Sequence, residues 1–348
     1  MNKVDGRLLF LLNRNTGLLF FRMSFSLVDL STGKRILICR MPVGKKTLLA
    51  SRFRLLSRLK RLEPKCIGRL SETEFIVSLL RSIWVLDVEK KTCKKLCDNP
   101  IGFSEVINFC STEDGVYWGD YGQNKEYHSV NVYCMDKKHN LSIVYSFPAG
   151  SVRHIHNIVK DSDGFLLFVG DNESQAGIYR VNHDWTKVSP WKIGEQQYRA
   201  VIGFPVRDGL LYATDSVETE NHLRLIKVNG TEQVLASING SCIYGGETRD
   251  FYLFSTTVEP HEGGGIVNMF SNQLGGGIKS REVHILSVRK NDLSFKIIKQ
   301  YKKDRWPMKL FQYGRAPFAG GQIEATEGIW CYPIACVGTK GQSEFIKF

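Results

Sequence analysis

Short apolar runs alternate with polar turns along most of the chain, and one arrangement of the two recurs. In each copy an acidic residue, usually followed by Gly, begins an apolar run; a polar loop, a second apolar run, a polar hairpin and a third apolar run follow. The clear copies begin at Asp114, Asp163, Asp208, Asp250 and Glu327. Their starts are separated by 49, 45, 42 and 77 residues, and weaker copies lie within 17–37 and 72–87.

The apolar runs are short and rich in Val, Ile, Tyr, Phe and Trp, which predicts β-strands. The Asp-Gly pairs predict tight turns, because Gly adopts positive φ without steric cost. A repeat of about 40–50 residues that holds several strands is typical of a β-propeller. We therefore predict an all-β fold over 1–348, a single propeller domain with seven blades, or six as the alternative.

The last repeat is too short to supply four strands, because the chain ends soon after its third apolar run. We expect a strand from the N-terminal region, in Leu8–Leu12, to complete the final blade. Closure of this kind removes an exposed sheet edge.

One segment departs from the strand pattern. Residues 45–62 place Leu49, Phe53, Leu56 and Leu59 at helical spacing, with Arg and Lys at most other positions. This spacing predicts an amphipathic basic helix. Two roles stay open for it: its apolar stripe packs on the propeller, or it contacts an anionic membrane surface or a protein partner.

Composition and charge narrow the class of protein. With 43% hydrophobic and 24% charged residues, the 348-residue chain is globular rather than disordered. The net charge is +12, but residues 1–70 hold 16 basic and 3 acidic side chains while the remainder holds 31 and 32. A nucleic-acid binder would spread positive charge along a groove, so we predict no nucleic-acid partner.

No apolar run reaches the roughly 18 residues of a membrane span, and no cleavage site follows the first apolar run. We therefore predict a cytoplasmic protein, with a location peripheral to the inner membrane as the alternative. The nine cysteines are scattered, which in that compartment predicts free thiols.

Propeller geometry predicts where the polar residues meet. The residues that follow each second strand and those that open each first strand lie around one mouth of the central channel. Side chains at these positions, together with His222 in the following loop, are Asp120, Tyr121, Asp171, Glu173, Asp215, Glu259, His154, His156, Gln197, Tyr198, Arg199, Tyr244, Gln312 and Arg315. Their convergence predicts a site for a polar ligand.

His154 and His156 alternate on one strand, so both face the same side of it. They suit proton transfer in sugar chemistry. They also suit a divalent metal, with His222 or Gln197 as a further ligand. The third alternative is a pair of structural histidines.

The acidic and basic candidates have similar alternatives. Asp120, Asp171 and Asp215 occupy equivalent places, either as carboxylates that flank a glycosidic bond or as acceptors for loop N–H groups. Arg199 and Arg315 suit a ligand carboxylate, which guanidinium binds through two hydrogen bonds, or pair with an Asp of the channel wall. The tyrosines either stack on sugar rings or fill the channel.

Two hairpins, 178–188 and 285–295, resemble the Ser-x-Asp-x-Gly-x-Thr-Trp turns of BNR-repeat, sialidase-like propellers, although their Ser and Gly are largely replaced. Residues 100–335 are similar to uncharacterised bacterial members that are often associated with surface-polysaccharide genes. The Arg-Ile-Pro motif and the arginine triad of sialidases are not matched, so sialic acid hydrolysis is not predicted. His154-x-His156 also resembles propeller uronate lyases, which bind a divalent metal through histidines and a glutamine.

We predict a carbohydrate-active propeller that acts on a glycan or another sugar-containing substrate, with a glycoside hydrolase-like reaction. The alternatives are a non-catalytic glycan-binding or scaffolding propeller in polysaccharide assembly and a metal-dependent polysaccharide lyase. The catalytic candidates are Asp120, His154, His156, Asp171 and Asp215. The substrate-binding candidates are Tyr121, Glu173, Gln197, Tyr198, Arg199, His222, Tyr244, Glu259, Gln312 and Arg315.

Overall fold

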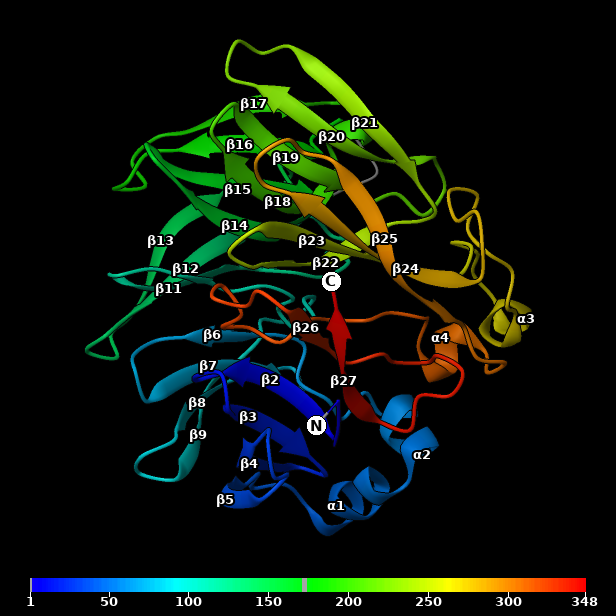
Figure 1. The fold of residues 1–348 in the computed structure, drawn as a ribbon. Coiled ribbons are helices and arrows are strands. Elements are labelled where there is room, and N and C mark those ends of the chain that lie inside the picture. Colours follow the sequence, from blue (N-terminus) through cyan, green and yellow to red (C-terminus); the bar gives the residue numbers. More distant parts are fainter. Residues whose placement is uncertain (1, 171–173) are drawn as a thin grey trace. The chain divides into compact units, whose positions relative to one another are not determined.

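The computed structural model describes residues 2–170 and 174–348. The described residues form seven sheets of antiparallel strands, which are the blades of a β-propeller (Figure 1). The predicted all-β fold with seven blades is confirmed, and the alternative of six blades is wrong. By their contacts, the residues group into two compact units. Unit 1 is Met1–Glu63, Asp215–Arg224 and Gln233–Phe348, and unit 2 is Pro64–Thr214 and Leu225–Glu232.

The first four blades each contain four strands in chain order. Blade 1 holds β2 (Arg7–Leu11), β3 (Thr16–Phe21), β4 (Ser24–Asp29) and β5 (Arg35–Arg40). Blade 2 holds β6 (Ile67–Arg69), β7 (Glu74–Leu79), β8 (Ser82–Asp87) and β9 (Thr92–Asp98). Blade 3 holds β10 (Cys110–Ser111), β11 (Gly115–Gly119), β12 (Val130–Asp136) and β13 (Leu141–Phe147). Blade 4 holds β14 (His154–Asp161), β15 (Gly164–Gly170), β16 (Gly177–Val181) and β17 (Val188–Ile193).

The remaining blades follow the same order except at the end of the chain. Blade 5 holds β18 (Ala200–Val206), β19 (Gly209–Thr214), β20 (Asn221–Lys227) and β21 (Glu232–Ile238). Blade 6 holds β22 (Cys242–Glu247), β23 (Phe251–Thr256), β24 (Glu282–Arg289) and β25 (Phe295–Lys302). Blade 7 holds β26 (Gly328–Cys331), β27 (Gln342–Lys347) and β1 (Lys3–Asp5). The helices are α1 (Lys45–Arg52), α2 (Arg54–Leu59), the 3-10 turn η1 (Gln196–Tyr198), α3 (Ile266–Phe270) and α4 (Met308–Phe311).

The repeated Asp-Gly pairs lie at the turns that lead into the second strands of the blades, as predicted. Gly164 and Gly209 begin two of these strands with φ of +139° and +144°. A Cβ at Gly164 would lie 2.1 Å from the Val181 carbonyl oxygen, and one at Gly209 would lie 1.9 Å from that of Ile226. These turns therefore require glycine for its backbone conformation and for its lack of a side chain.

Burial explains the apolar runs. All seven residues of β15 are buried, whereas the fourth strand of blade 6, β25, is mostly exposed. A strand covered on both faces reads as a continuous apolar run, and a strand at the outer edge reads as polar or alternating. The cores of both units are apolar clusters of such inner strands.

The N-terminal strand of blade 7 is not the one predicted from the sequence. β1 pairs with β27, with Val4 opposite Ser343, whereas most of Leu8–Leu12 belongs to β2 in blade 1. Gly6 lies between β1 and β2 with φ of +99°, a conformation that lets the chain turn from one blade to the next. Leu8 and Leu9 are buried, so these larger apolar residues contribute to a core instead of an outer edge.

The predicted basic helix is present as two helices, because Phe53 adopts an extended conformation between α1 and α2. The leucine-rich stripe does not pack on a blade: the exposed fractions of Leu49 and Phe53 are 57% and 55%. The buried side chain of α2 is instead Arg58. Its guanidinium donates to Asp304 Oδ2 at 2.5 Å and to the Phe311 carbonyl. A specific hydrogen-bonded ion pair therefore fixes the helices, and most of their apolar side chains face outward.

Candidate functional site

The two candidate histidines lie side by side at the start of β14 in unit 2. His154 Nε2 and His156 Nε2 are 2.9 Å apart, and the ring centroids are 4.8 Å apart. The strand register shifts between Ile155 and Asn157, opposite β15. On β15, a Cβ at Gly170 would lie 1.9 Å from His156 Nε2 and 2.5 Å from His154 Nε2. Gly170 therefore provides the space that the two imidazoles occupy.

Hydrogen bonds assign the imidazole protons. His156 Nδ1 lies 2.9 Å from the Ala200 carbonyl oxygen, which only accepts, so Nδ1 carries the proton and donates. His156 Nε2 is then an acceptor, and His154 Nε2–H donates to it. This leaves His154 Nδ1 as a buried acceptor without a well-aligned hydrogen bond in the described part of the chain, although the Gly122 backbone lies near enough to this imidazole to raise its pKa in part.

Both imidazoles are uncharged at neutral pH. Burial and the nearby Arg199 guanidinium lower the pKa of His156 to about 3, despite the hydrogen bond to Ala200. Burial, His156 and Arg199 lower the pKa of His154 well below its usual value. The Tyr121 ring lies edge-on at 5.0 Å from the His154 ring. Neutral imidazoles, a guanidinium and a phenol ring thus form one cluster.

Among the described residues, the cluster offers no further ligands for a divalent metal. The positive charge of Arg199 lowers the pKa of both imidazoles, and the same charge disfavours a metal cation beside them. The Gln197 amide donates to Glu195 Oε2 at 2.6 Å, and His222 Nε2 lies 3.7 Å from Glu220 Oε2. Within residues 2–170 and 174–348 no three His, Cys, Asp or Glu side chains are grouped as metal ligands.

Asp120 follows β11, and its side chain faces strand β12. Its Oδ2 accepts the Asn131 backbone N–H at 2.8 Å and lies 3.5 Å from the Tyr133 hydroxyl. Burial raises the pKa of Asp120 to about 6, although these hydrogen bonds lower it. Asp120 lines a cavity of about 120 Å³ together with Asp98, Tyr121 and Tyr133. A carboxyl group with this pKa can exchange protons near neutral pH.

The other candidates of unit 2 are engaged or lie outside the described residues. The Tyr198 hydroxyl donates to Glu232 Oε1 at 2.8 Å, so its polar end is already paired. Asp171 and Glu173 lie outside the described residues.

In unit 1, Arg315 and Gln312 are buried and bonded to each other. Arg315 donates to Gln312 Oε1, and the Gln312 amide donates to the Arg58 carbonyl at 2.9 Å. Burial acts to lower the pKa of Arg315, and nearby Tyr244 and other polar groups act to raise it. Two further candidates, Asp215 and Glu259, are also buried. The prediction that all the candidates share one channel mouth stays a prediction.

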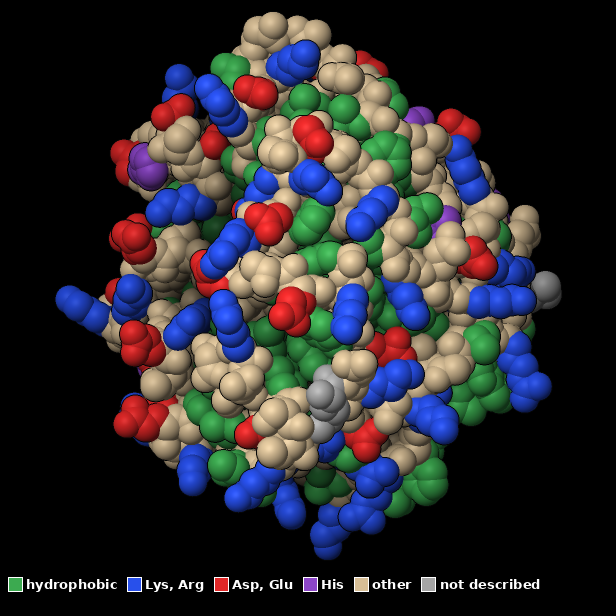
Figure 2. Space-filling view, in the orientation of Figure 1, with side chains coloured by type: hydrophobic (Ala, Val, Ile, Leu, Met, Phe, Trp, Pro, Cys, Tyr) green, Lys and Arg blue, Asp and Glu red, His purple; other side chains and the backbone are tan. Residues whose placement is uncertain are grey.

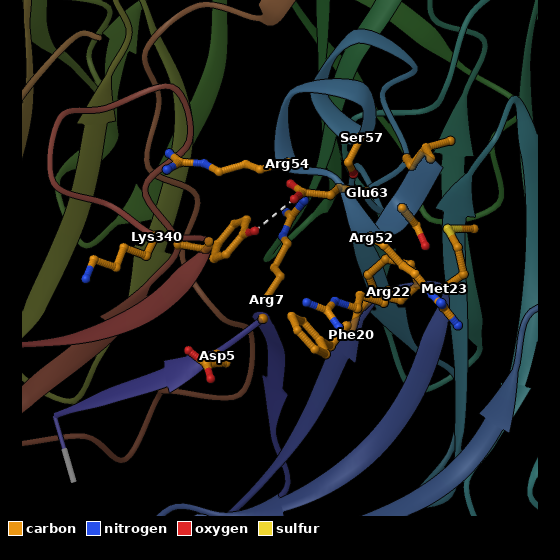
Figure 3. A pocket seen from close by; sticks show the side chains of 16 residues that line it. Asp5, Arg7, Phe20, Arg22, Met23, Arg52, Arg54, Ser57, Glu63 and Lys340 are labelled. Atoms are coloured by element: carbon orange, nitrogen blue, oxygen red, sulfur yellow. Dashed lines mark hydrogen bonds between the residues drawn. The ribbon is translucent and has the colours of Figure 1, made fainter. Parts of the chain in front are cut away.

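Sequence reasoning missed a group in unit 1: Arg7, Glu63 and Tyr332, which line a cavity of about 250 Å³ (Figure 3). The rule applied to the other blades would have found two of them, because Arg7 opens β2 and Tyr332 follows β26. Glu63 follows the helical segment, where no repeat pattern marks it.

No protein family model matches the sequence, and no curated protein does either. Similar solved structures include an oligogalacturonate lyase from Vibrio parahaemolyticus, with 9% identity over 99% of this chain and 90% of that chain and a TM-score of 0.54. An oligogalacturonate lyase in complex with manganese gives the same values. The AfRom2 CNH domain is 9% identical over 99% of this chain and 94% of that chain, with a TM-score of 0.54.

These similarities show the propeller fold, which hosts many unrelated activities. The resemblance to BNR-repeat propellers stays a prediction. No helix in the described part of the chain has the length and apolar character needed to cross a membrane.

Proposed function

We propose that this protein is a glycan-binding propeller that binds an acidic sugar at the cluster of His154, His156 and Arg199. The observation that supports the proposal is His154 Nδ1, a buried acceptor without a well-aligned hydrogen bond in the described residues, close to a guanidinium. A sugar hydroxyl offers a donor to His154 Nδ1, and the positive charge of Arg199 attracts a sugar carboxylate. The similarity to oligogalacturonate lyases agrees with a sugar ligand.

Each group of the cluster has a role in this complex. The Arg199 guanidinium binds the sugar carboxylate through charge-assisted hydrogen bonds. A ring hydroxyl donates to His154 Nδ1, and His156 holds the His154 ring in place through the bond between their Nε2 atoms. Tyr121, which is half-buried beside His154, provides an aromatic surface for the sugar ring.

The low pKa of His156 favours binding over catalysis at this cluster. An imidazole with a pKa of about 3 is a weak base at neutral pH, and a general base works best when its pKa lies near the pH of the reaction. Proton abstraction by this pair is therefore slow.

The experiment compares an acidic with a neutral oligosaccharide by isothermal titration calorimetry, using oligogalacturonate and its methyl ester. Arg199→Ala should weaken oligogalacturonate binding by about tenfold or more and leave the ester unaffected. Arg180→Ala is the matched control, because Arg180 is exposed and stacks on Trp191 in β17. Equal affinity of the unaltered protein for acid and ester would exclude this proposal.

Glycoside hydrolysis at Asp120 is the second candidate. Asp98 and Asp120 line one cavity, and their pKa values are shifted in opposite directions: hydrogen bonds lower that of Asp98, and burial raises that of Asp120. Two carboxyl groups that titrate apart suit an acid and a base. Release of reducing ends from a polysaccharide panel, lost in Asp120→Asn, would favour hydrolysis. The same loss in Glu113→Gln, an exposed control, would attribute it to a general defect.

The exposed helices support a second partner, an anionic membrane surface. Exposed Leu49, Phe53, Leu56 and Leu59 alternate with basic residues on α1 and α2. Hydrophobic and basic side chains lie next to each other along the lower edge of Figure 2, where Figure 1 places these helices. Apolar side chains that enter the acyl boundary and cations that meet acidic headgroups are the two components of peripheral binding. A cytoplasmic location at the inner membrane agrees with this arrangement.

A further inference from the structure

Unit 1 contains a cavity of about 250 Å³. None of the residues that line it belongs to the histidine cluster. Its walls come from the start of β2, the turn between β3 and β4, helices α1 and α2, and the segment between β26 and β27 (Figure 3). Sites for drug-sized ligands are commonly about 300–1,000 Å³. This volume therefore fits one small ring or a short polyol rather than an oligosaccharide.

The cavity is positively charged. Five basic residues and two acidic residues line it. The basic residues are Arg7, Arg22, Arg52, Arg54 and Lys340. Among the described residues, Arg52 and Lys340 have neither an ion-pair nor a hydrogen-bond partner, and Arg54 donates only to Thr339 Oγ1, at 3.2 Å. A guanidinium group binds an anion such as phosphate through paired hydrogen bonds, so these side chains suit an anionic ligand.

The buried side of the cavity contains a carboxylate oxygen that needs a hydrogen-bond donor. The Tyr332 hydroxyl donates to Glu63 Oε1 at 2.8 Å, and the Glu63 carboxylate lies beside the Arg7 guanidinium (Figure 3). Glu63 Oε2 is buried and accepts no hydrogen bond from the described residues. Burial lowers the pKa of Arg7, and the charge of Glu63 partly offsets this effect. A carboxylate oxygen in this position needs a donor such as a ligand hydroxyl.

We propose that this cavity binds a small phosphate-bearing polyol, such as a sugar phosphate or a phosphorylated glycerol. The phosphate contacts the guanidiniums of Arg52 and Arg54 and the Lys340 ammonium, and a hydroxyl group of the same molecule donates to Glu63 Oε2. Phe20, which is buried, forms an apolar wall beside the ring or carbon chain. The site is independent of acidic sugar binding at His154.

The test is calorimetry of the full chain with three probes: glucose 6-phosphate, inorganic phosphate and glucose. Glucose 6-phosphate should bind saturably and more tightly than inorganic phosphate, and glucose should not bind. The double variant Arg52→Ala and Arg54→Ala should weaken glucose 6-phosphate by about tenfold or more. Lys45→Ala and Lys60→Ala are matched controls, since both lysines are exposed on the same helical segment and do not line the cavity.

A second variant separates recognition from folding. Glu63→Gln removes a negative charge, so inorganic phosphate should bind more tightly while the preference for glucose 6-phosphate becomes smaller. A residue with only a structural role would change both affinities by the same factor and leave the preference unchanged. Unchanged affinity in the double arginine variant, or no binding of either phosphate, would overturn the proposal.

A competition experiment with vesicles shows whether the phosphate belongs to a lipid headgroup or to a free polyol. Vesicles that contain phosphatidylglycerol present a phosphate and hydroxyl groups on a lipid headgroup. If glucose 6-phosphate displaces the protein from these vesicles, the ligand is a lipid headgroup. If it binds without displacing the protein, the ligand is a free phosphorylated polyol.

Discussion

His154 Nε2 and His156 Nε2 lie 2.9 Å apart, although the two residues belong to the same strand and are both uncharged at neutral pH. The contact requires one imidazole to donate and the other to accept. The Ala200 carbonyl keeps the proton of His156 on Nδ1, so His156 Nε2 is the acceptor and His154 Nε2–H is the donor. The pair therefore has a fixed direction, and it ends in an acceptor atom, His154 Nδ1, that a ligand can use.

Gly170→Ala should disrupt this pair. The new Cβ would lie 1.9 Å from His156 Nε2, so the imidazoles would have to move against the residues packed around them. We expect a loss of about 1–3 kcal/mol in the free energy of unfolding, measured by urea denaturation. Gly44→Ala is the control, since a Cβ there meets nothing within 4 Å. Equal stability of the two variants would show that the pair is not tightly packed.

The free energy of unfolding should decrease as the pH is lowered, because His156 is buried and uncharged in the folded protein. Its pKa is about 3 in the folded protein and about 6.5 in the unfolded chain, so the unfolded chain binds more protons between these values. The contribution of His156 to stability is complete above pH 6.5 and decreases by up to about 1.4 kcal/mol per pH unit below it. His156→Gln should reduce this slope between pH 6.5 and 4.5, measured by denaturation at each pH. Identical slopes would contradict the prediction.

Arg58→Ala should release α1 and α2 from the propeller. It removes the ion pair with Asp304 and the bond to the Phe311 carbonyl, so we expect a loss of about 3 kcal/mol and faster proteolysis within 45–62. Asp304 keeps a second partner, Lys303, at 2.6 Å, which limits the cost. Lys46→Ala is the control from the same segment, because Lys46 is exposed. Proteolysis at the same rate in both variants would mean that other contacts hold the helices.

Membrane binding should depend on the exposed apolar residues as well as on charge. We expect the protein to float with vesicles that contain phosphatidylglycerol and not with phosphatidylcholine alone. The combined change Leu49→Ser, Phe53→Ser and Leu56→Ser should abolish flotation while the fold is retained, because these side chains are exposed. Val228→Ser, which changes an exposed apolar residue in another blade, should have no effect. Flotation of the triple variant would exclude these helices as the membrane contact.

The propeller could be predicted from the sequence because its inner strands are apolar runs that recur at nearly constant spacing. The same reasoning did not find the strand of blade 7. Leu8–Leu12 is an apolar run, whereas Lys3-Val4-Asp5 has one apolar residue, and its strand conformation comes from pairing with residues more than 330 positions away. Local pattern holds no information about such pairing.

The helical segment shows a second limit. Its periodicity predicted a helix but left open whether the leucine face packs on the blades or contacts a membrane or a partner. The buried side chain is Arg58, because Asp304 and the Phe311 carbonyl offer it a hydrogen-bonded partner. The same limit applies to Glu63, whose significance comes from Tyr332 and the surrounding cations in the folded chain.

The pairing of β1 with β27 has a consequence for biosynthesis. Val4 is synthesised more than 330 residues before its partner Ser343. Until then the first strand has no partner strand, and pairing between segments so far apart in the sequence slows folding. Blade 7 is therefore expected to assemble last, and removal of residues 2–5 would leave the edge of β27 open to another chain.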